Sequence, residues 1–260
     1  MTPPLSLRPL VRALLSIALL CLLVAPAQAD DAPSAIRIVT EELPPYNMTV
    51  DGKLTGMSTE VVQAILKRIH VQATVQSMPW ARAYDLALND ENVLIYSITR
   101  TPERESLFKW VGPLGFSRWY LFSYVNHPVQ LQQLEDAKRF QTATVNEDVG
   151  EQYLVGKQFT VGVQLQSSVR YELNYQKLRL GHVDLWISDE LNARYLARMA
   201  GDDPARVLIP SLRLPELEDS GGFSIAFSRR TPDATVQLFQ QGLQAIHDDG
   251  TYDAIVRKWN

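Results

Sequence analysis

The sequence contains a single cysteine, Cys21, which lies inside an apolar segment near the N-terminus. Leu20 stands before it, where a lipoprotein signal requires a small residue. Once such a leader is removed, the mature chain has no thiol and can form no disulfide, so its stability must come from its hydrophobic core. The remaining ~230 residues are enough to build one.

The apolar segment has the features of a secretory signal peptide over residues 1–29. Arg8 and Arg12 precede an apolar run at 13–25, and Ala27-Gln28-Ala29 supplies the small-x-small pattern that signal peptidase reads. The run is short for the ~30 Å of hydrocarbon in a membrane, and no later segment approaches the length of a span. We therefore expect a periplasmic protein.

Basic residues are too few and too dispersed for a polyanion-binding protein. The chain has 25 Lys and Arg against 29 Asp and Glu, a net charge of −4, and loss of the leader with its two arginines makes this −6. No run of five or more Lys or Arg occurs. This balance argues against nucleic acid and anionic membrane surfaces as partners.

Signatures of common enzymes and cofactor sites are also missing. The sequence has no G-x-S-x-G, no H-E-x-x-H and no glycine-rich phosphate loop. Its four histidines stand singly, which does not suit a metal site. We expect no metal and no cofactor. The isolated histidines are His70, His127, His182 and His247.

Hydrophobic periodicity predicts an α/β fold with two parallel sheets. Strand-like and helix-like segments alternate in two series separated by an extended aromatic segment at 119–125. The run at 93–98 is apolar on both faces, as a central parallel strand should be. Predicted strands cover 36–40, 71–75, 93–98, 142–145, 160–163, 183–187 and 223–227; predicted helices cover 61–69, a patch after Trp80, 149–155, 169–178, 191–199, 236–246 and 252–259.

Two connections between the sheets are predicted, one at the aromatic segment and one between Leu212 and Gly222, where Pro215 and two glycines interrupt regular structure. If the C-terminal helices return to the first sheet, two crossings form a hinge with a cleft between two lobes. Ligands in open α/β sheets bind beyond the carboxyl ends of the strands. The residues just after each strand are therefore the candidates for a site.

Hydroxyl groups and an arginine follow the strand at 93–98, in the sequence from Ser97 and Thr99 to Arg104. Two hydroxyls and a guanidinium suit a carboxylate, because arginine offers planar, paired donors that stay charged. The alternative is a solvated arginine paired with Glu103 or Glu105.

Asp189 follows the strand at 183–187 and could bind a ligand ammonium, although an aspartate there commonly caps the next helix. Tyr46 and Trp80 stand in loops, where they could wall a ligand pocket or simply pack in the core. The segment 146–150 precedes a helix whose free amides could hold an anion, but its own Glu147 and Asp148 make it a poor anion site.

Taken together, these motifs make the chain similar to family 3 of the bacterial extracellular solute-binding proteins, from about residue 36 to residue 260. The family includes the periplasmic polar amino-acid receptors of ABC transporters, and this chain looks like a divergent branch. The motifs that carry the resemblance are Thr101-Pro102-Glu103-Arg104 with Phe108, Gly181-His182-Val183-Asp184 leading to Asp189, and Asp249-Gly250-Thr251-Tyr252 with Lys258-Trp259.

The resemblance implies a type II periplasmic-binding-protein fold: two lobes, each a mainly parallel sheet flanked by helices, joined by a two-strand hinge. The implied division is a signal peptide at 1–29, a discontinuous first lobe at 30–122 and 222–260, and a second lobe at 123–221. It further implies a monomer that binds a small amino-acid-like ligand by lobe closure and delivers it to a membrane ABC permease.

In such receptors the arginine of the turn holds the α-carboxylate and the aspartate holds the α-ammonium, roles that fall here on Arg104 and Asp189. Ser97 and Thr99 match assisting positions, and Tyr46 and Trp80 lie where relatives wall the pocket. The chain departs from the common pattern at Leu43-Pro44 and Gly56-Met57-Ser58, which leaves side-chain selectivity open.

Two other readings remain open at this point. Some relatives are periplasmic cyclohexadienyl dehydratases, and a dehydratase would use Arg104 to hold a cyclic carboxylate and Glu41 or Glu190 to transfer the proton. Others serve as sensors for a membrane signalling protein. As a receptor, the chain is expected to bind its ligand with Arg104, Asp189, Thr99, Ser97, Tyr46, Trp80 and Glu41, without catalysis.

Overall fold

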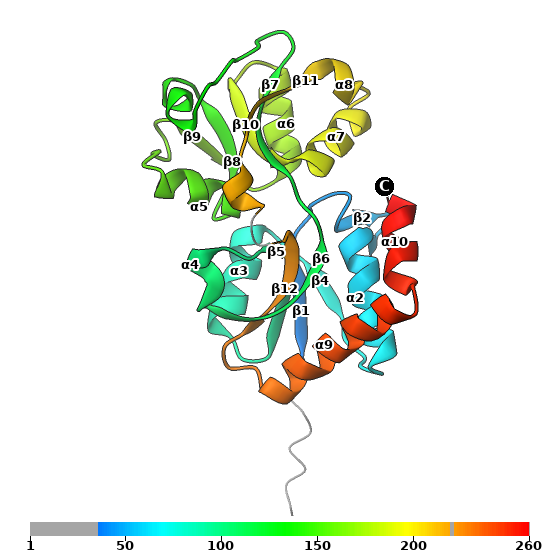
Figure 1. Cartoon of the computed structure of the whole chain (residues 1–260). Coiled ribbons are helices and arrows are strands. Elements are labelled where there is room, and N and C mark those ends of the chain that lie inside the picture. Colours follow the sequence, from blue (N-terminus) through cyan, green and yellow to red (C-terminus); the bar gives the residue numbers. More distant parts are fainter. Residues whose placement is uncertain (1–35, 219–220, 260) are drawn as a thin grey trace, which may run out of the picture. The chain divides into compact units, whose positions relative to one another are not determined.

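The computed structural model describes residues 36–218 and 221–259; the predicted signal peptide at 1–29 lies outside them. No helix in these two described stretches has both the length and the apolar character needed to cross a membrane. They form two five-stranded sheets with helices packed against them (Figure 1). We call each sheet with its helices a lobe.

The first lobe is built on a sheet with strand order β4-β1-β5-β12-β6. β12 runs antiparallel to both neighbours, and the other four strands share one direction. The strands are β1 (Arg37–Thr40), β4 (Val75–Ser77), β5 (Val93–Thr99), β6 (Phe108–Gly115) and β12 (Phe223–Ser228), and a separate hairpin joins β2 (Met48–Val50) to β3 (Lys53–Thr55).

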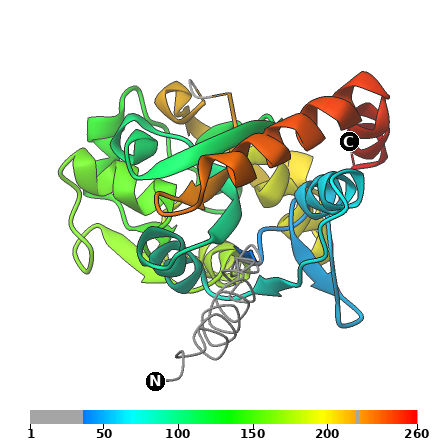
Figure 2. The same ribbon diagram turned by 90° about the horizontal axis from the view of Figure 1, so that it is seen from below.

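Helices cover both faces of this sheet. Alternate residues of β1 and β5 point to opposite sides, so Ile38 and Leu94 pack with α2 and α9, whereas Val39 and Ile95 pack with α3. α9 packs against α2, and in Figure 2 α9 (orange) lies lengthwise whereas α2 (cyan) is seen nearly end-on. All seven residues of β5 are consequently buried. The helices are α2 (Met57–Arg68), α3 (Trp80–Asn89), α4 (Pro102–Glu105), α9 (Asp233–Asp248) and α10 (Thr251–Trp259).

The second lobe has the strand order β11-β7-β10-β8-β9, with β7 antiparallel to its neighbours and the other four strands in one direction. The strands are β7 (Trp119–Tyr124), β8 (Thr142–Val145), β9 (Leu165–Ser168), β10 (Leu185–Asp189) and β11 (Leu208–Arg213). The helices are η1 (Leu134–Arg139), α5 (Val149–Gly156), α6 (Tyr171–Arg179), α7 (Glu190–Met199), α8 (Pro204–Val207) and η2 (Pro215–Leu217).

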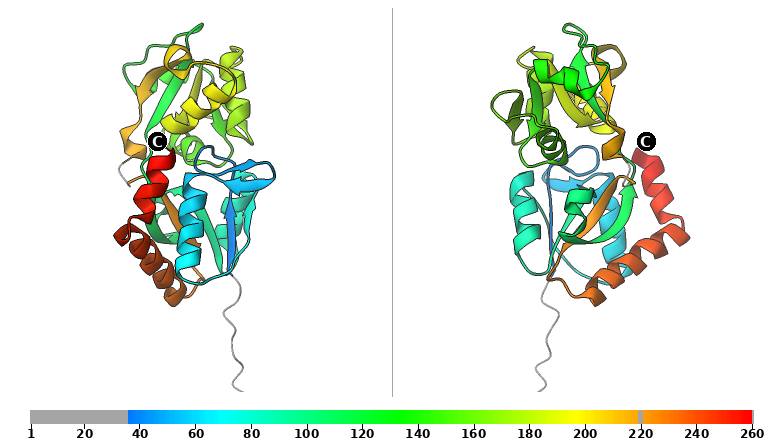
Figure 3. Two further views of the ribbon diagram at one scale, coloured as in Figure 1. Left: turned by 90° about the vertical axis from the view of Figure 1, so that its right-hand side faces the viewer. Right: turned by 60° about the vertical axis from the view of Figure 1, so that its left-hand side comes forward.

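The chain passes between the lobes twice, from β6 to β7 and from β11 to β12 (Figure 3). The second passage lies where proline and glycine predicted it. The first lies N-terminal to the prediction, because the aromatic segment at 119–125 is not itself the crossover. It forms β7, which pairs with both β10 and β11, so the chain enters the second sheet before Trp119 rather than at the predicted boundary of 122 and 123.

Two predicted strands are misplaced by a few residues. The segment 160–163 is a turn rather than a strand, because Val163 and Gln164 both donate backbone hydrogen bonds to the Thr160 carbonyl, and the strand begins only at Leu165. Of the alternating residues at 71–75, only Val75 lies in β4, of which it is the first residue. β-branched residues favoured extended structure in both places, but the backbone pairing lies further along the chain.

Candidate functional site

The residues expected to form the site lie at the carboxyl ends of parallel strands in both lobes. Glu41 follows β1, Ser97 and Thr99 end β5, and Asp189 ends β10. Arg104 is on the short helix α4 that follows β5. All five side chains are buried. Tyr46, from the loop after β1, and Trp80, the first residue of α3, are buried as well.

Arg104 faces the second lobe. Its Nε and Nη2 donate to Oε1 of Gln152 on α5 at 3.1 and 2.9 Å, and its Nη1 donates to the Thr99 carbonyl at 3.2 Å. The guanidinium carbon lies 5.4 Å from the ring centre of Trp80 and 5.0 Å from that of Tyr84. Burial lowers the pKa of Arg104, and nearby Tyr84 and Asp148 counteract that shift. A buried cation thus donates to an uncharged acceptor.

The surface ion pair considered for this turn belongs to a different arginine. Arg100 donates to both carboxylate oxygens of Glu105, each at 2.6 Å, and this pair is substantially exposed. The solvated arginine paired with an acid is therefore Arg100. Arg104, four residues later, points into the space between the lobes.

Ser97 and Thr99 have buried hydroxyls without a hydrogen-bond partner in the described part of the chain. Ser97 is unusual in having φ at +60° inside a strand. The pairing of β5 with β12 shifts register between Ser224 and Ile225, so Ser97 is the extra residue of a β-bulge. Bulges redirect side chains next to binding sites. Both hydroxyls are thus available to a ligand, and their part in binding an anion stays a prediction.

Trp80 joins the lobes as well as covering Arg104. Its Nε1 donates to the backbone carbonyl of Glu147 at 2.8 Å, and its ring stacks on Tyr84 at 5.6 Å between centroids. The ring packs in the core and lies beside the Arg104 guanidinium, and the role of Trp80 as a wall of a ligand pocket stays a prediction.

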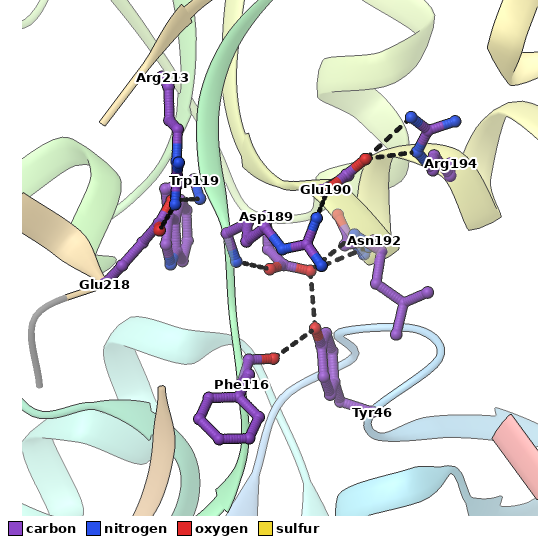
Figure 4. A network of polar contacts seen from close by, with 11 residues as sticks. Tyr46, Phe116, Trp119, Asp189, Glu190, Asn192, Arg194, Arg213 and Glu218 are labelled. Atoms are coloured by element: carbon purple, nitrogen blue, oxygen red, sulfur yellow. Dashed lines mark hydrogen bonds and ion pairs between the residues drawn. The ribbon is translucent and has the colours of Figure 1, made fainter. Parts of the chain in front are cut away.

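Asp189 acts as a helix cap and also contacts the first lobe (Figure 4). Its Oδ1 accepts from the backbone amides of Leu191 and Asn192 at 2.9 and 3.2 Å, and its Oδ2 accepts from the Arg118 amide at 2.9 Å. The Tyr46 hydroxyl donates to Oδ1 at 2.8 Å. Burial raises the pKa of Asp189 to about 6, although these four hydrogen bonds act to lower it.

A glycine fixes the loop that carries Tyr46. Gly56 has φ at +115°, and a Cβ there would lie 2.5 Å from the Tyr46 carbonyl oxygen. This close approach lets the amides of Met57 and Ser58 at the start of α2 donate to the carbonyls of Pro45 and Tyr46. The loop is thereby held toward the second lobe, where Asn192 Nδ2 donates to the Pro44 carbonyl at 2.7 Å.

Glu41 is buried, yet its carboxyl has no hydrogen-bond partner among the residues that the structure describes. It lines a cavity of about 250 Å³ whose other walls include Met78 and Pro79 of the first lobe and Val169 and Arg170 of the second. Burial, followed by the charge of Asp148, raises the pKa of Glu41 well above its ordinary range.

Glu190, the other acid considered for proton transfer, is committed to ion pairs. Its carboxylate lies 3.3 Å from Arg118 and 2.8 Å from Arg194. Together with Tyr46 and Asp189 it lines a cavity of about 550 Å³. The two acids therefore differ in their contacts: the Glu41 carboxyl has no hydrogen-bond partner in the described residues, whereas Glu190 has two arginine partners.

Sequence reasoning missed three residues of the site: Gln152, Tyr84 and Tyr171. Gln152 lies four residues after Asp148, so the two share a helix face, and that spacing was a usable signal. Tyr84 stands in the same relation to Trp80. The Tyr171 hydroxyl donates a hydrogen bond to Asp148, the N-cap of α5. No local sequence pattern predicts this contact between α6 and the start of α5.

Comparison with known proteins agrees with this architecture. The family model for "Bacterial extracellular solute-binding proteins, family 3" matches residues 36–260. A probable histidine-binding protein of Campylobacter jejuni is 22% identical over 220 residues, covering 83% of this chain and 80% of the relative. The L-cystine-binding protein TcyJ of Escherichia coli is 23% identical over 218 residues, covering 83% and 78%.

Solved structures confirm the predicted two-lobed, type II periplasmic-binding-protein fold. An ancestral arginine-binding protein bound to arginine superposes with a TM-score of 0.74 at 20% identity, covering 87% of this chain and 99% of that one. A histidine kinase sensor domain with similarity to periplasmic binding proteins gives 0.73 at 19% identity, covering 86% and 95%. At sequence identities this low, the similarity to these structures shows only that the fold is shared.

Proposed function

Because the chain belongs to family 3 of the bacterial extracellular solute-binding proteins, we propose that it is a periplasmic receptor for a small polar ligand, an amino acid or a close relative. The observation that carries this proposal is the pair Arg104 and Asp189. Both are buried, they come from different lobes, and each stands at the carboxyl end of a sheet. The names of the relatives, which bind histidine, cystine and arginine, support an amino acid.

We assign the ligand carboxylate to Arg104 and the free hydroxyls of Ser97 and Thr99. A carboxylate can replace Gln152 as the acceptor for Nε and Nη2, which exchanges a neutral acceptor for a charged one. The guanidinium is already an ionised donor, so a carboxylate adds the attraction of the opposite charge, and its two oxygens match the planar pair of donors. The ammonium is assigned to Asp189, whose partner Tyr46 completes that end of the site from the first lobe.

Closure of the lobes supplies the selectivity. Direct contacts already connect the two lobes, from Tyr46 to Asp189, from Trp80 to Glu147 and from Asn192 to Pro44. A ligand bound between them is removed from water, which strengthens its charge pairs as the local dielectric constant falls. The ligand shifts the equilibrium between the open and closed forms only as far as it binds the closed form more tightly than the open one. We propose that an ABC permease then recognises the closed receptor.

We favour binding without turnover over a dehydratase. The curated relatives carry names of binding proteins, and Glu190 is held in two ion pairs. The Glu41 carboxyl has no hydrogen-bond partner in the described residues, and this suits a contact with a bound ligand as well as it suits an acid in catalysis. Purified protein should return its ligand chemically unchanged, and conversion of a bound compound would reverse this assignment.

The test is ligand binding by purified mature protein and by Arg104→Ala, with Arg100→Ala as the matched control. Thermal-shift screening across amino acids identifies the ligand, since a ligand at 100 times its dissociation constant adds ~2.7 kcal/mol of stability. Loss of a desolvated charge partner costs ~2–5 kcal/mol, so Arg104→Ala should weaken binding about thirty-fold or more. Arg100→Ala should bind as the wild type does. Equal affinities in all three proteins would remove Arg104 from the site.

A further inference from the structure

Gln152 and a ligand carboxylate compete for the same two donors of Arg104. The Nε and Nη2 groups form one edge of the planar guanidinium, and such an edge suits the two oxygens of a carboxylate. Both groups donate to the single oxygen Oε1 of Gln152, at 3.1 and 2.9 Å, while Nη1 is turned to the Thr99 carbonyl. The contact with Gln152 and a paired contact with a carboxylate therefore exclude each other.

The contact between Arg104 and Gln152 also joins the two lobes. Arg104 is on α4 of the first lobe, and Gln152 is on α5 of the second. Arg104 is only 1% exposed, so water does little to screen its charge. A hydrogen bond to a charged group contributes more to stability than one between neutral groups. The contact therefore favours the closed arrangement by itself.

Other contacts between the lobes can persist when a carboxylate binds to Arg104. Tyr46 and Trp80 each donate a hydrogen bond to the second lobe, and neither bond involves the guanidinium. They can stabilise the closed form both with and without a ligand. The contact between Arg104 and Gln152 differs from them, because a ligand that takes the same edge of the guanidinium has to break it.

The surroundings of Gln152 leave room for its side chain to withdraw. Gln152 is partly buried and lies in the wall of a cavity of about 810 Å³ between α4 and α5. Thr101, Glu103 and Lys157 also line this cavity and offer polar groups to an amide. The side chain can thus turn away from Arg104 into polar surroundings rather than into an apolar core. Release of the contact then leaves no buried amide unpaired, which would be costly.

Gln152 has the chemistry of an acceptor that a ligand can displace. Its amide offers Arg104 one neutral oxygen, and the buried hydroxyls of Ser97 and Thr99 have no partner in the described residues. A carboxylate brings the opposite charge and a second oxygen, so it binds this group of donors more strongly than an amide does. A glutamate at position 152 would instead form an ion pair with Arg104 and withhold it from the ligand.

We propose that Gln152 is an internal competitor of the ligand, which occupies the carboxylate-binding edge of Arg104, closes the lobes in the ligand-free protein and thereby sets the affinity of the receptor. This inference rests on the proposed receptor function and adds a regulatory contact to the same site. The apparent affinity is lowered by the fraction of protein that Gln152 holds closed, because only the remaining fraction can bind the ligand.

The series Gln152→Leu, wild type and Gln152→Glu grades the internal acceptor from none to charged. The probe is L-histidine or L-arginine, whichever stabilises the wild type in thermal-shift screening. In calorimetry Gln152→Leu should bind about 3–10-fold more tightly than the wild type, and Gln152→Glu at least ~10-fold more weakly. In stopped-flow fluorescence the gain in Gln152→Leu should come from faster association, with dissociation unchanged.

A glutamine that contacts the ligand itself gives the opposite sign. Gln152→Leu would then bind the probe more weakly than the wild type does and release it faster. Either that result or an unchanged affinity in Gln152→Leu would overturn the internal competitor and leave the receptor intact.

Lobe closure in the free protein tests the same inference without a ligand. Cys21 is the only cysteine and lies in the predicted leader, so introduced cysteines can carry spin labels without a competing thiol. Arg82→Cys on α3 and Gln176→Cys on α6 place one exposed label on each lobe. Pulsed electron resonance distances should show about 10-fold less of the closed form, relative to the open form, in Gln152→Leu than in the wild type, and about 10-fold more in Gln152→Glu. Identical distance distributions in the three proteins would overturn the proposal.

Gln240, an exposed residue of α9, provides the matched controls. Gln240→Leu and Gln240→Glu make the same chemical changes in a helix of the first lobe, and both should behave as the wild type does in binding and in lobe distance. The two measurements also separate this inference from the function on which it rests. If no amino acid stabilises the wild type or Gln152→Leu, the receptor function is refuted, and the distances alone decide whether Gln152 closes the lobes.

Discussion

Replacing Asp189 by asparagine should change the pH dependence of folding stability in a defined direction. Burial raises the pKa of this carboxyl from its ordinary value of 3.8 to about 6 in the folded protein. The folded protein thus binds the proton more tightly than the unfolded chain does. The proton therefore favours folding, and its contribution is complete below about pH 4 and is lost as the pH rises through about 6.

The size of the effect follows from that difference. About two pKa units correspond to about 3 kcal/mol over the whole range, of which about 2 kcal/mol falls between about pH 4.5 and about pH 7.5. Asparagine keeps an oxygen for the amides of Leu191 and Asn192, so the helix cap persists. It places an NH₂ group opposite the Arg118 amide, which adds a cost that does not depend on pH.

Urea denaturation of both proteins across this range measures the difference. The free energy of unfolding of the wild type, taken relative to that of Asp189→Asn, should fall by about 2 kcal/mol as the pH rises. Asp203→Asn supplies the reference, since it makes the same change at an exposed cap. A difference that stays constant, or that grows with pH, would refute the view that burial dominates the environment of Asp189.

Two further outcomes are expected. Tyr46→Phe keeps the ring but removes a hydrogen bond to a buried carboxylate, so ligand affinity should fall by about 10-fold or more in calorimetry; an unchanged affinity would show that this contact does not favour closure. Gly242→Ala should destabilise by about 1–3 kcal/mol in urea, because the added Cβ lies 2.6 Å from Ile69, whereas Gly156→Ala meets nothing within 4 Å and should not.

The hydrophobic pattern predicted those strands whose position depends only on which residues are buried. The strand at 93–98 was recognised because both of its faces are apolar, and the structure buries all of β5. The hairpin of β2 and β3 was missed although Asp51-Gly52 is a strong turn signal, and both residues have positive φ. The sheet to which the aromatic strand β7 belongs could not be read from the sequence, because strand pairing depends on partners distant in the chain.

The sequence suggested which residues to consider for the candidate site, but it did not predict the contacts that these residues make. Position after a strand singled out Arg104 and Asp189, and both are buried at the interface of the lobes. The contact of Asp189 with Tyr46 joins residues 143 positions apart, and that of Arg104 with Gln152 joins residues 48 apart. No local pattern encodes such pairs, since they arise from how the two sheets face each other.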